Sequence, residues 1–171
     1  MPFLSNPLDA SPNLQTEIKK HEPFDDRGQE AYLNLIRTAG QLSADFHQLF
    51  KQHGLSQTSY NVLRILRGAQ DHDDPAGLPC LEVGSRLITR VPDITRLVNR
   101  LIDAGLVIRT RTDADRRVAR VSITDAGRAL LDKLDGPVLE MHHRQLSHLT
   151  EKELAEFNRL LEKARAASPP C

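Results

Sequence analysis

The chain has 171 residues, with 23 Lys and Arg side chains balanced by 23 Asp and Glu side chains, so its formal net charge is zero. This length suits one domain with a hydrophobic core, or one domain with added dimerisation helices. No apolar run approaches the roughly 18 residues of a membrane span, no secretory signal opens the chain, and two cysteines are too few for a disulfide framework. These features exclude a membrane-embedded or disulfide-stapled protein and predict a cytoplasmic one.

Residues 1–28 are predicted to form a flexible N-terminal tail. Prolines at positions 2, 7, 12 and 23 interrupt every short apolar run, and Ser, Asn and Asp fill the gaps. One short helix over residues 14–20 is compatible with this pattern. From residue 29 to residue 50, apolar side chains recur mostly three and four positions apart, which predicts a long helix that Gly54 ends.

Two shorter helices are predicted next, separated by a loop. Ser56 is a good N-cap for a helix that is expected to stop at Gly68. Residues 71–79 are rich in Asp, Gly and Pro, which is loop chemistry. Residues 81–87 are predicted to form a helix that turns three side chains inward, namely Leu81, Val83 and Leu87. A turn over residues 89–91 then leads into the next helix.

The helix that begins near Pro92 has two contrasting faces. Pro92 suits the first helical position, and Asp93 complements the positive end of the helix dipole. One stripe is apolar and predicted to be core: Ile94, Leu97, Val98, Leu101 and Ile102. The other side carries Asp93, Thr95, Arg96, Asn99, Arg100 and Asp103. Arg can pair with guanine and Asn with adenine, so this side suits the major groove of DNA, although a merely solvated face has the same composition.

A charged hairpin is predicted directly after this helix. Gly105 ends the helix, and residues 106–110 and 118–123 read as two strands around a tip at residues 112–117. From residue 86 to residue 128 there are ten arginines against five aspartates, although the whole chain is neutral. These arginines are expected to share one exposed surface. Helix, turn, helix and hairpin in this order predict a winged helix-turn-helix that binds DNA.

The C-terminal third favours a dimer. Thr124 can cap a helix that Gly136 and Pro137 are expected to interrupt, and residues 150 and 153 form a capping box for a last helix. Both helices carry apolar stripes beyond the winged domain. Pairing with a second subunit would bury these stripes, whereas a closed monomeric bundle is the alternative.

The chain resembles the MarR family of bacterial transcriptional regulators. The resemblance is carried by Ile94-Thr95-Arg96-Leu97-Val98-Asn99-Arg100-Leu101, Gly105-Leu106-Val107, Asp115-Arg116-Arg117 and Ile123-Thr124-Asp125-Ala126-Gly127. It implies a mainly α fold with a small β-wing, organised as a winged helix-turn-helix over about residues 55–124, dimerisation helices over about 29–50 and 125–166, and a tail at 167–171. It departs from many members of the family in having Arg90-Val91-Pro92-Asp93 where they have small hydroxyl residues.

The resemblance also implies a homodimer that binds a pseudo-palindromic double-stranded DNA operator. Asp115 would brace an arginine of the wing, and Arg116 or Arg117 would approach the minor groove. The predicted DNA-binding residues are Arg90, Pro92, Asp93, Thr95, Arg96, Asn99, Arg100, Arg116 and Arg117. The preferred hypothesis is therefore a repressor, and the alternative is a winged-helix adaptor that binds proteins and not DNA.

A small aromatic or amphipathic acid is the expected inducer. Four side chains are candidates to line its pocket, with a role in the core as the alternative: Tyr32, Phe46, His47 and Tyr60. No catalytic or cofactor motif occurs, so no enzyme activity and no cofactor is predicted. No metal site is predicted either, because His142, His143 and His148 lack further ligands at helical spacing.

Overall fold

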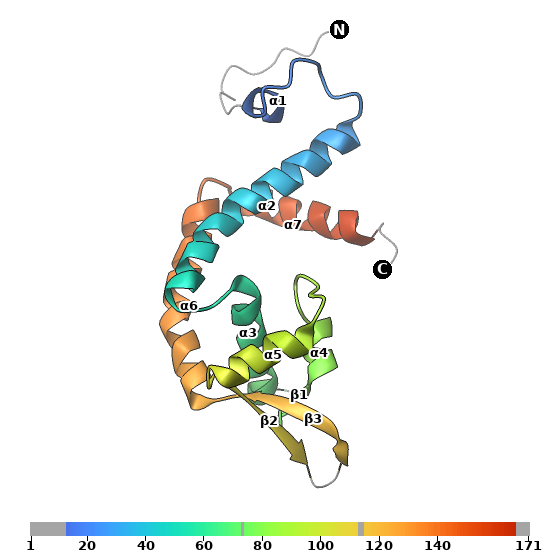
Figure 1. Ribbon diagram of the computed structural model, residues 1–171. Coiled ribbons are helices and arrows are strands. Elements are labelled where there is room, and N and C mark those ends of the chain that lie inside the picture. Colours follow the sequence, from blue (N-terminus) through green and yellow to red (C-terminus); the bar gives the residue numbers. More distant parts are fainter. Residues whose placement is uncertain (1–12, 73, 113–114, 167–171) are drawn as a thin grey trace. The chain divides into compact units, whose positions relative to one another are not determined.

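The computed structural model describes residues 13–72, 74–112 and 115–166, and it leaves out the side chains of residues 111, 112 and 115–118. The chain divides into two compact units, residues 1–45 and residues 46–171, and each is described by itself. The elements in chain order are α1 (Leu14–Glu17), α2 (Arg27–Gln52), α3 (Gln57–His72), β1 (Leu78–Pro79), α4 (Cys80–Ser85), α5 (Ile94–Asp103), β2 (Val107–Thr112), β3 (Asp115–Ile123), α6 (Asp125–Leu146) and α7 (Glu151–Ala166) (Figure 1). The predicted class, mainly α with a small β-wing, is confirmed.

The first unit consists of α1 and most of α2. Asn13 caps α1 by accepting a 3.0 Å hydrogen bond from the backbone N–H of Thr16, and Leu14 is buried. Glu17 forms an ion pair with Arg37 of α2. The segment predicted as a tail therefore contains a short helix that is tied to α2, and α2 begins at Arg27, two residues before the predicted start.

The second unit has one hydrophobic core, built from the end of α2, helices α3 to α6 and the sheet. Phe50 stacks on Tyr60 with ring centroids 4.4 Å apart, which joins α2 to α3. The largest fully buried side chains are Phe50, Leu63, Leu66, Leu131, Leu134, Val62, Val83, Val98, Val107 and Val121. These residues come from α2, α3, α4, α5, α6 and both long strands, so burial of their apolar surface holds the helix-turn-helix and the hairpin to α6.

The boundaries of α3 follow one prediction and contradict another. Ser56 caps the helix, because its Oγ accepts a 3.0 Å hydrogen bond from the backbone N–H of Ser59. The predicted stop at Gly68 is wrong, since α3 continues to His72. Ala69 is buried in the core, and this packing outweighs the roughly 1 kcal/mol that Gly costs inside a helix.

The sheet has three antiparallel strands in the order β1-β3-β2, and its short edge strand was not predicted. Leu78 of β1 pairs with Val121 of β3, and Val107 of β2 pairs with Ile123. Gly77 precedes β1 with a φ of +88°, and a Cβ there would overlap the carbonyl oxygen of Val121. Glycine at this position therefore lets the loop after α3 come close enough to β3 to pair with it.

Helix α4 differs from its prediction in which side chains it buries. Val83 and Leu87 are buried as expected, but Leu81 was wrongly predicted to face inward and is 81% exposed. Val83 and Leu87 are four positions apart and share one face, whereas Leu81 precedes Val83 by two positions and lies on the opposite side.

The two C-terminal helices begin at the predicted caps. Thr124 Oγ1 accepts a 3.1 Å hydrogen bond from Gly127 N, and Thr150 N donates to Glu153 Oε2 across 2.8 Å in the predicted capping box. Pro137 lies inside α6 and does not end it, because the helix assignment is continuous from Asp125 to Leu146. Leu134 and Val138 on either side of the proline are buried, and this packing holds the helix together where one backbone hydrogen bond is missing.

Candidate nucleic-acid interface

Helix α5 begins at Ile94, two residues after Pro92, the predicted first helical residue. Asp93 is the N-cap, and its side chain accepts a 2.8 Å hydrogen bond from the backbone N–H of Arg96. Pro92 therefore precedes the cap and is not the first helical residue, which corrects the prediction. A carboxylate is among the strongest N-caps, because it satisfies one free backbone N–H and complements the helix dipole.

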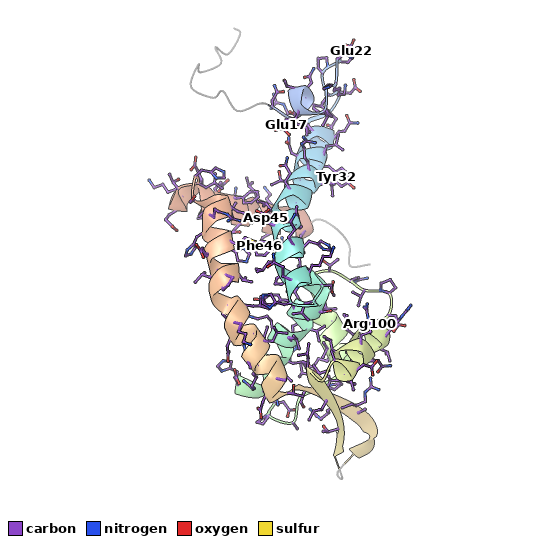
Figure 2. All side chains as sticks on the ribbon, turned by 60° about the vertical axis from the view of Figure 1, so that its left-hand side comes forward. Glu17, Glu22, Tyr32, Asp45, Phe46 and Arg100 are labelled. Carbon is purple, nitrogen blue, oxygen red and sulfur yellow. The ribbon has the colours of Figure 1, made fainter. Side chains whose placement is uncertain are left out.

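The two faces of α5 are as predicted. Leu97, Val98 and Leu101 are buried in the core, so the opposite face is turned outward. That face exposes Thr95, Arg96, Asn99, Arg100 and Asp103. Figure 2 shows Arg100 projecting from α5 into the solvent. Within the described part of the chain, neither Arg96 nor Arg100 forms an ion pair, so both guanidinium groups are available to an external anion.

Small residues fix the junction between α5 and the β2–β3 hairpin. Gly105 ends α5 with a φ of +71°, which a residue with a Cβ rarely adopts. Thr124 Oγ1 donates a 2.8 Å hydrogen bond to the carbonyl oxygen of Gly105. Gly127 packs so tightly that a Cβ would overlap the carbonyl oxygen of Leu106. The hairpin is thus held in a defined place directly after α5 (Figure 1).

The wing residues chosen from the sequence lie in β3. Asp115, Arg116 and Arg117 begin that strand, and their side chains lie outside the described part of the structure, as do residues 113 and 114 entirely. The predicted bracing by Asp115 and the predicted groove contacts of the two arginines therefore stay predictions.

Carboxylates of the protein pair with Arg86, Arg120 and Arg128, which are among the ten arginines between residues 86 and 128. Arg120 contacts Asp74 and also donates a 2.7 Å hydrogen bond to the carbonyl oxygen of Gly77. The other two form ion pairs, Arg128 with Asp71 at 2.9 Å and Arg86 with Glu82 at 2.6 Å. The hydrogen bond from Arg128 lowers the pKa of Asp71. The charges of these three arginines are therefore matched by carboxylates within the protein, and the expectation that all ten share one surface stays a prediction.

Arg109 of β2 is a candidate residue that the sequence prediction did not select. Its Nη2 donates a 3.0 Å hydrogen bond to Oδ1 of Asn99, so it belongs to the exposed face of α5. Alternation along the strand could have found it, because Arg109 lies two positions after the buried Val107 and thus on the same face of β2.

A second candidate site is a cleft of about 510 Å³ in the second unit. Its lining comes from α3, α6 and the chain between α4 and α5, and comprises Tyr60, Asn61, Arg64, Ile65, Arg86, Ile88, Asp135, Val138, Leu139 and His142. Arg64 and Arg67 each donate a 2.9 Å hydrogen bond to Asp135. The hydrogen bond from Arg67, together with the charges of both arginines, lowers the pKa of Asp135. The cleft therefore combines apolar walls with fixed charges of both signs.

One of the four residues proposed from the sequence for a ligand pocket lines this cleft. Tyr60 lines the cleft. Phe46 is buried and packs against His142, with ring centroids 4.6 Å apart, and Figure 2 shows it reaching from α2 toward α6. His47 is exposed and is not part of the lining. Tyr32 belongs to the first unit and is 62% exposed.

The chain is similar to transcriptional regulators over most of its length. Residues 45–134, just over half of the chain, match the family described as transcriptional regulator SarA/Rot. A MarR transcription factor from Planctomyces limnophilus, known from its crystal structure, is 48% identical, covers 82% of this chain and 98% of its own, and gives a TM-score of 0.61. The HTH-type transcriptional repressor IacR of Pseudomonas putida is 26% identical over 145 residues, which is 83% of each chain. The homoprotocatechuate degradative operon repressor of Escherichia coli is 27% identical over 120 residues, 69% of this chain and 76% of that protein.

A polar recognition helix followed by a basic two-stranded hairpin defines the winged helix-turn-helix class of DNA-binding transcription regulators. The chain belongs to the MarR family of this class, as the resemblance in its sequence predicted. Its relatives are transcription regulators and not enzymes. Among the described residues, no helix is both long and apolar enough to cross a membrane.

Proposed function

We propose that this regulator is a homodimeric repressor that places α5 of each subunit in the major groove of a pseudo-palindromic operator. The observation that carries the proposal is the exposed face of α5, where Thr95, Arg96, Asn99 and Arg100 lie opposite a buried stripe and beside the hairpin. These side chains can contact phosphates and base edges together. The repressors of P. putida and E. coli, at 26% and 27% identity, support repression as the outcome.

The dependence of duplex binding on salt tests this proposal. A protein that contacts several phosphates releases counterions, so the logarithm of its affinity should fall with the logarithm of salt concentration at a slope of about −0.9 per phosphate contact. Arg116→Ala and Arg117→Ala should weaken binding to any duplex, whereas Arg96→Ala should also change sequence preference. Binding to no duplex at low salt would favour the alternative, an adaptor that binds proteins.

The dimer is supported by apolar side chains that remain exposed on the helices outside the winged domain. No side chain of α7, all of which is described, is buried, and Phe157 and Leu160 are exposed on it. In the first unit, three side chains of α2 are exposed as well: Tyr32, Leu35 and Ile36. A second copy of the chain that covers these side chains would give the two-fold symmetry of a palindromic operator.

The inducer is proposed to be a small aromatic acid that binds in the cleft. Tyr60, Ile65 and Val138 offer apolar contact to a ring, and Arg64 and Arg86 offer cations to a carboxylate. Arg86 and Ile88 lie in the chain just before α5, so a ligand between them and α6 can favour a different placement of the recognition helix. The site is supported by its combination of apolar and cationic side chains and by its position beside the chain that leads into α5.

A panel of phenolic acids tests the ligand proposal. Operator affinity should fall when an effective acid is added, and Arg64→Gln should reduce that response. Lys133→Gln is the matched control, because Lys133 is an exposed cation of α6 that does not line the cleft. A broad panel that leaves operator affinity unchanged, or equal responses of the two variants, would count against the cleft.

A further inference from the structure

The carboxamide of Asn99 is oriented by an arginine of the neighbouring strand. Arg109 Nη2 donates to Asn99 Oδ1 across 3.0 Å, and both side chains are exposed. A guanidinium group has donors and no acceptor, so only the oxygen end of the carboxamide can face it. The contact therefore fixes the orientation of the Asn99 carboxamide. Its oxygen is directed to Arg109, and its NH₂ group is left for an external partner.

This orientation conflicts with the way in which Asn usually reads adenine. Adenine recognition uses both ends of the carboxamide, because the oxygen accepts from the N6 amino group while the NH₂ group donates to N7. Here the Asn99 oxygen already accepts from Arg109 and lies beside a positive charge. An adenine amino group that approached this oxygen would meet another donor group at close range. Bidentate pairing with adenine is therefore disfavoured at this position.

The same arrangement suits guanine. Asn99 Nδ2 and the N–H groups of Arg109 that are not used in the contact are all donors. In the major groove, guanine presents two neighbouring acceptors, N7 and O6, and no donor. A surface composed only of donors is complementary to this edge. Both side chains lie on the outer side of α5 and its adjoining strand, where a base edge would be met.

We infer that Asn99 and Arg109 act as one donor pair that selects guanine at one position of each operator half-site. Arg109 has two roles in this scheme: its remaining N–H groups donate to the base, and its contact with Oδ1 keeps Asn99 from reading adenine. The inference rests on the proposed placement of α5 in the major groove. It differs from the general pairing of asparagine with adenine, on which the sequence comparison with the major groove was based.

Selection of bound duplexes from a random pool tests the inference with the full chain. For the parent protein, guanine should exceed adenine by about tenfold at the position that loses its preference in Asn99→Ala, within the range of a good bidentate contact. In Arg109→Ala the preference at that position should move toward adenine, because the N6 amino group no longer meets a competing donor and a positive charge beside Oδ1. Lys133→Gln is the control, since it removes an exposed cation of α6, outside α5 and the hairpin, and should leave the base preference of the parent unchanged.

A second measurement changes the DNA and uses the parent protein. The inference can therefore be tested even if a variant binds DNA too weakly for selection. Replacing the selected guanine by 7-deazaguanine removes the N7 acceptor and should weaken binding about five- to tenfold. Unchanged affinity would overturn the inference, as would adenine at that position for the parent or an unchanged preference in Arg109→Ala. A parent protein without any salt-dependent duplex binding would instead overturn the proposed function, so the two failures are distinguishable.

Discussion

At the scale of single residues, Asp135 is the carboxylate that joins α3 to α6 at the edge of the cleft. It accepts 2.9 Å hydrogen bonds from Arg64 and from Arg67. Its pKa is lowered from 3.8, first by the hydrogen bond with Arg67 and then by the charges of the two arginines. Because the charged form is favoured in the folded state, Asp135 stabilises the fold only while it is ionised.

We predict that this stabilisation is lost in acid. It should be fully present above the unfolded-state pKa of about 3.8 and disappear as the pH falls through the lower folded-state value. Asp135→Asn should therefore lower the free energy of unfolding near neutral pH, by about 1 kcal/mol or less because the pair is screened by solvent. Urea unfolding of both proteins at a series of pH values measures this effect. The difference in the free energy of unfolding between Asp135→Asn and the parent should shrink at the lowest pH values.

The control for this experiment is Asp103→Asn, which removes an exposed carboxylate of α5. It should change the free energy of unfolding little at either pH. A difference between Asp135→Asn and the parent that stays constant from neutral to acid pH would contradict the role given to Asp135.

Residue roles could be predicted from sequence where the partners are close along the chain. The caps at Thr124 and Thr150 were predicted and confirmed, because each bonds a residue three positions away. The partners of Arg120 and Arg109 were not predicted. Arg120 contacts Asp74, 46 positions earlier, and Arg109 contacts Asn99 only because β2 folds back beside α5. Such partners depend on tertiary packing and leave no local pattern.

At the scale of elements, α4 shows how a short helix can be predicted correctly while its buried face is misassigned. The helix has six residues and a single buried side chain, Val83, with Leu87 buried just beyond its end. Leu81 is an apolar residue on the outer face of this helix. Fewer than two turns are too short for a periodic pattern to establish which apolar residues share the buried face.

We predict opposite responses to substitution at these two positions. Val83→Ala should destabilise the fold by about 1.5–3 kcal/mol, because the side chain is fully buried in the core. Leu81→Ser should change the free energy of unfolding by less than about 0.5 kcal/mol, as is usual for an exposed site. Urea unfolding of the two variants and the parent measures both values. Equal destabilisation by the two substitutions would mean that Leu81 is covered in solution.

The longer elements were predicted well, and the errors have common causes. The long helices and both hairpin strands give strong periodic signals. Gly68 was wrongly taken as the end of α3, because the burial of Ala69 outweighs local helix propensity. The strand β1 has only two residues, and its pairing with β3 is visible only in the folded chain.

At the scale of the whole molecule, the proposed dimer requires that α7 meets another surface. Phe157 and Leu160 are three positions apart and therefore lie on one face of this helix, where they are 37% and 48% exposed. Aromatic side chains such as that of Phe157 are enriched in protein interfaces.

We predict that Phe157→Glu weakens the dimer by about tenfold or more, since interface positions with large aromatic anchors commonly cost over 1 kcal/mol when lost. Sedimentation velocity over a concentration series measures the change. Asn158→Glu adds the same charge at the neighbouring exposed position and should leave association unchanged. A parent chain that sediments as a monomer at all concentrations would reject the dimer.

The ion pairs that Arg86, Arg120 and Arg128 form with carboxylates of the protein affect how a DNA-binding regulator would find its operator in a genome. Each of these cations already has a carboxylate neighbour, so it adds little to the sequence-independent attraction that holds a protein on random DNA. In the proposed repressor, residence at incorrect sites would then be shorter, and occupancy of the operator would depend more on the side chains that contact bases. A chain with zero net charge would in this way bind random DNA more weakly and distinguish better between the operator and other sequences.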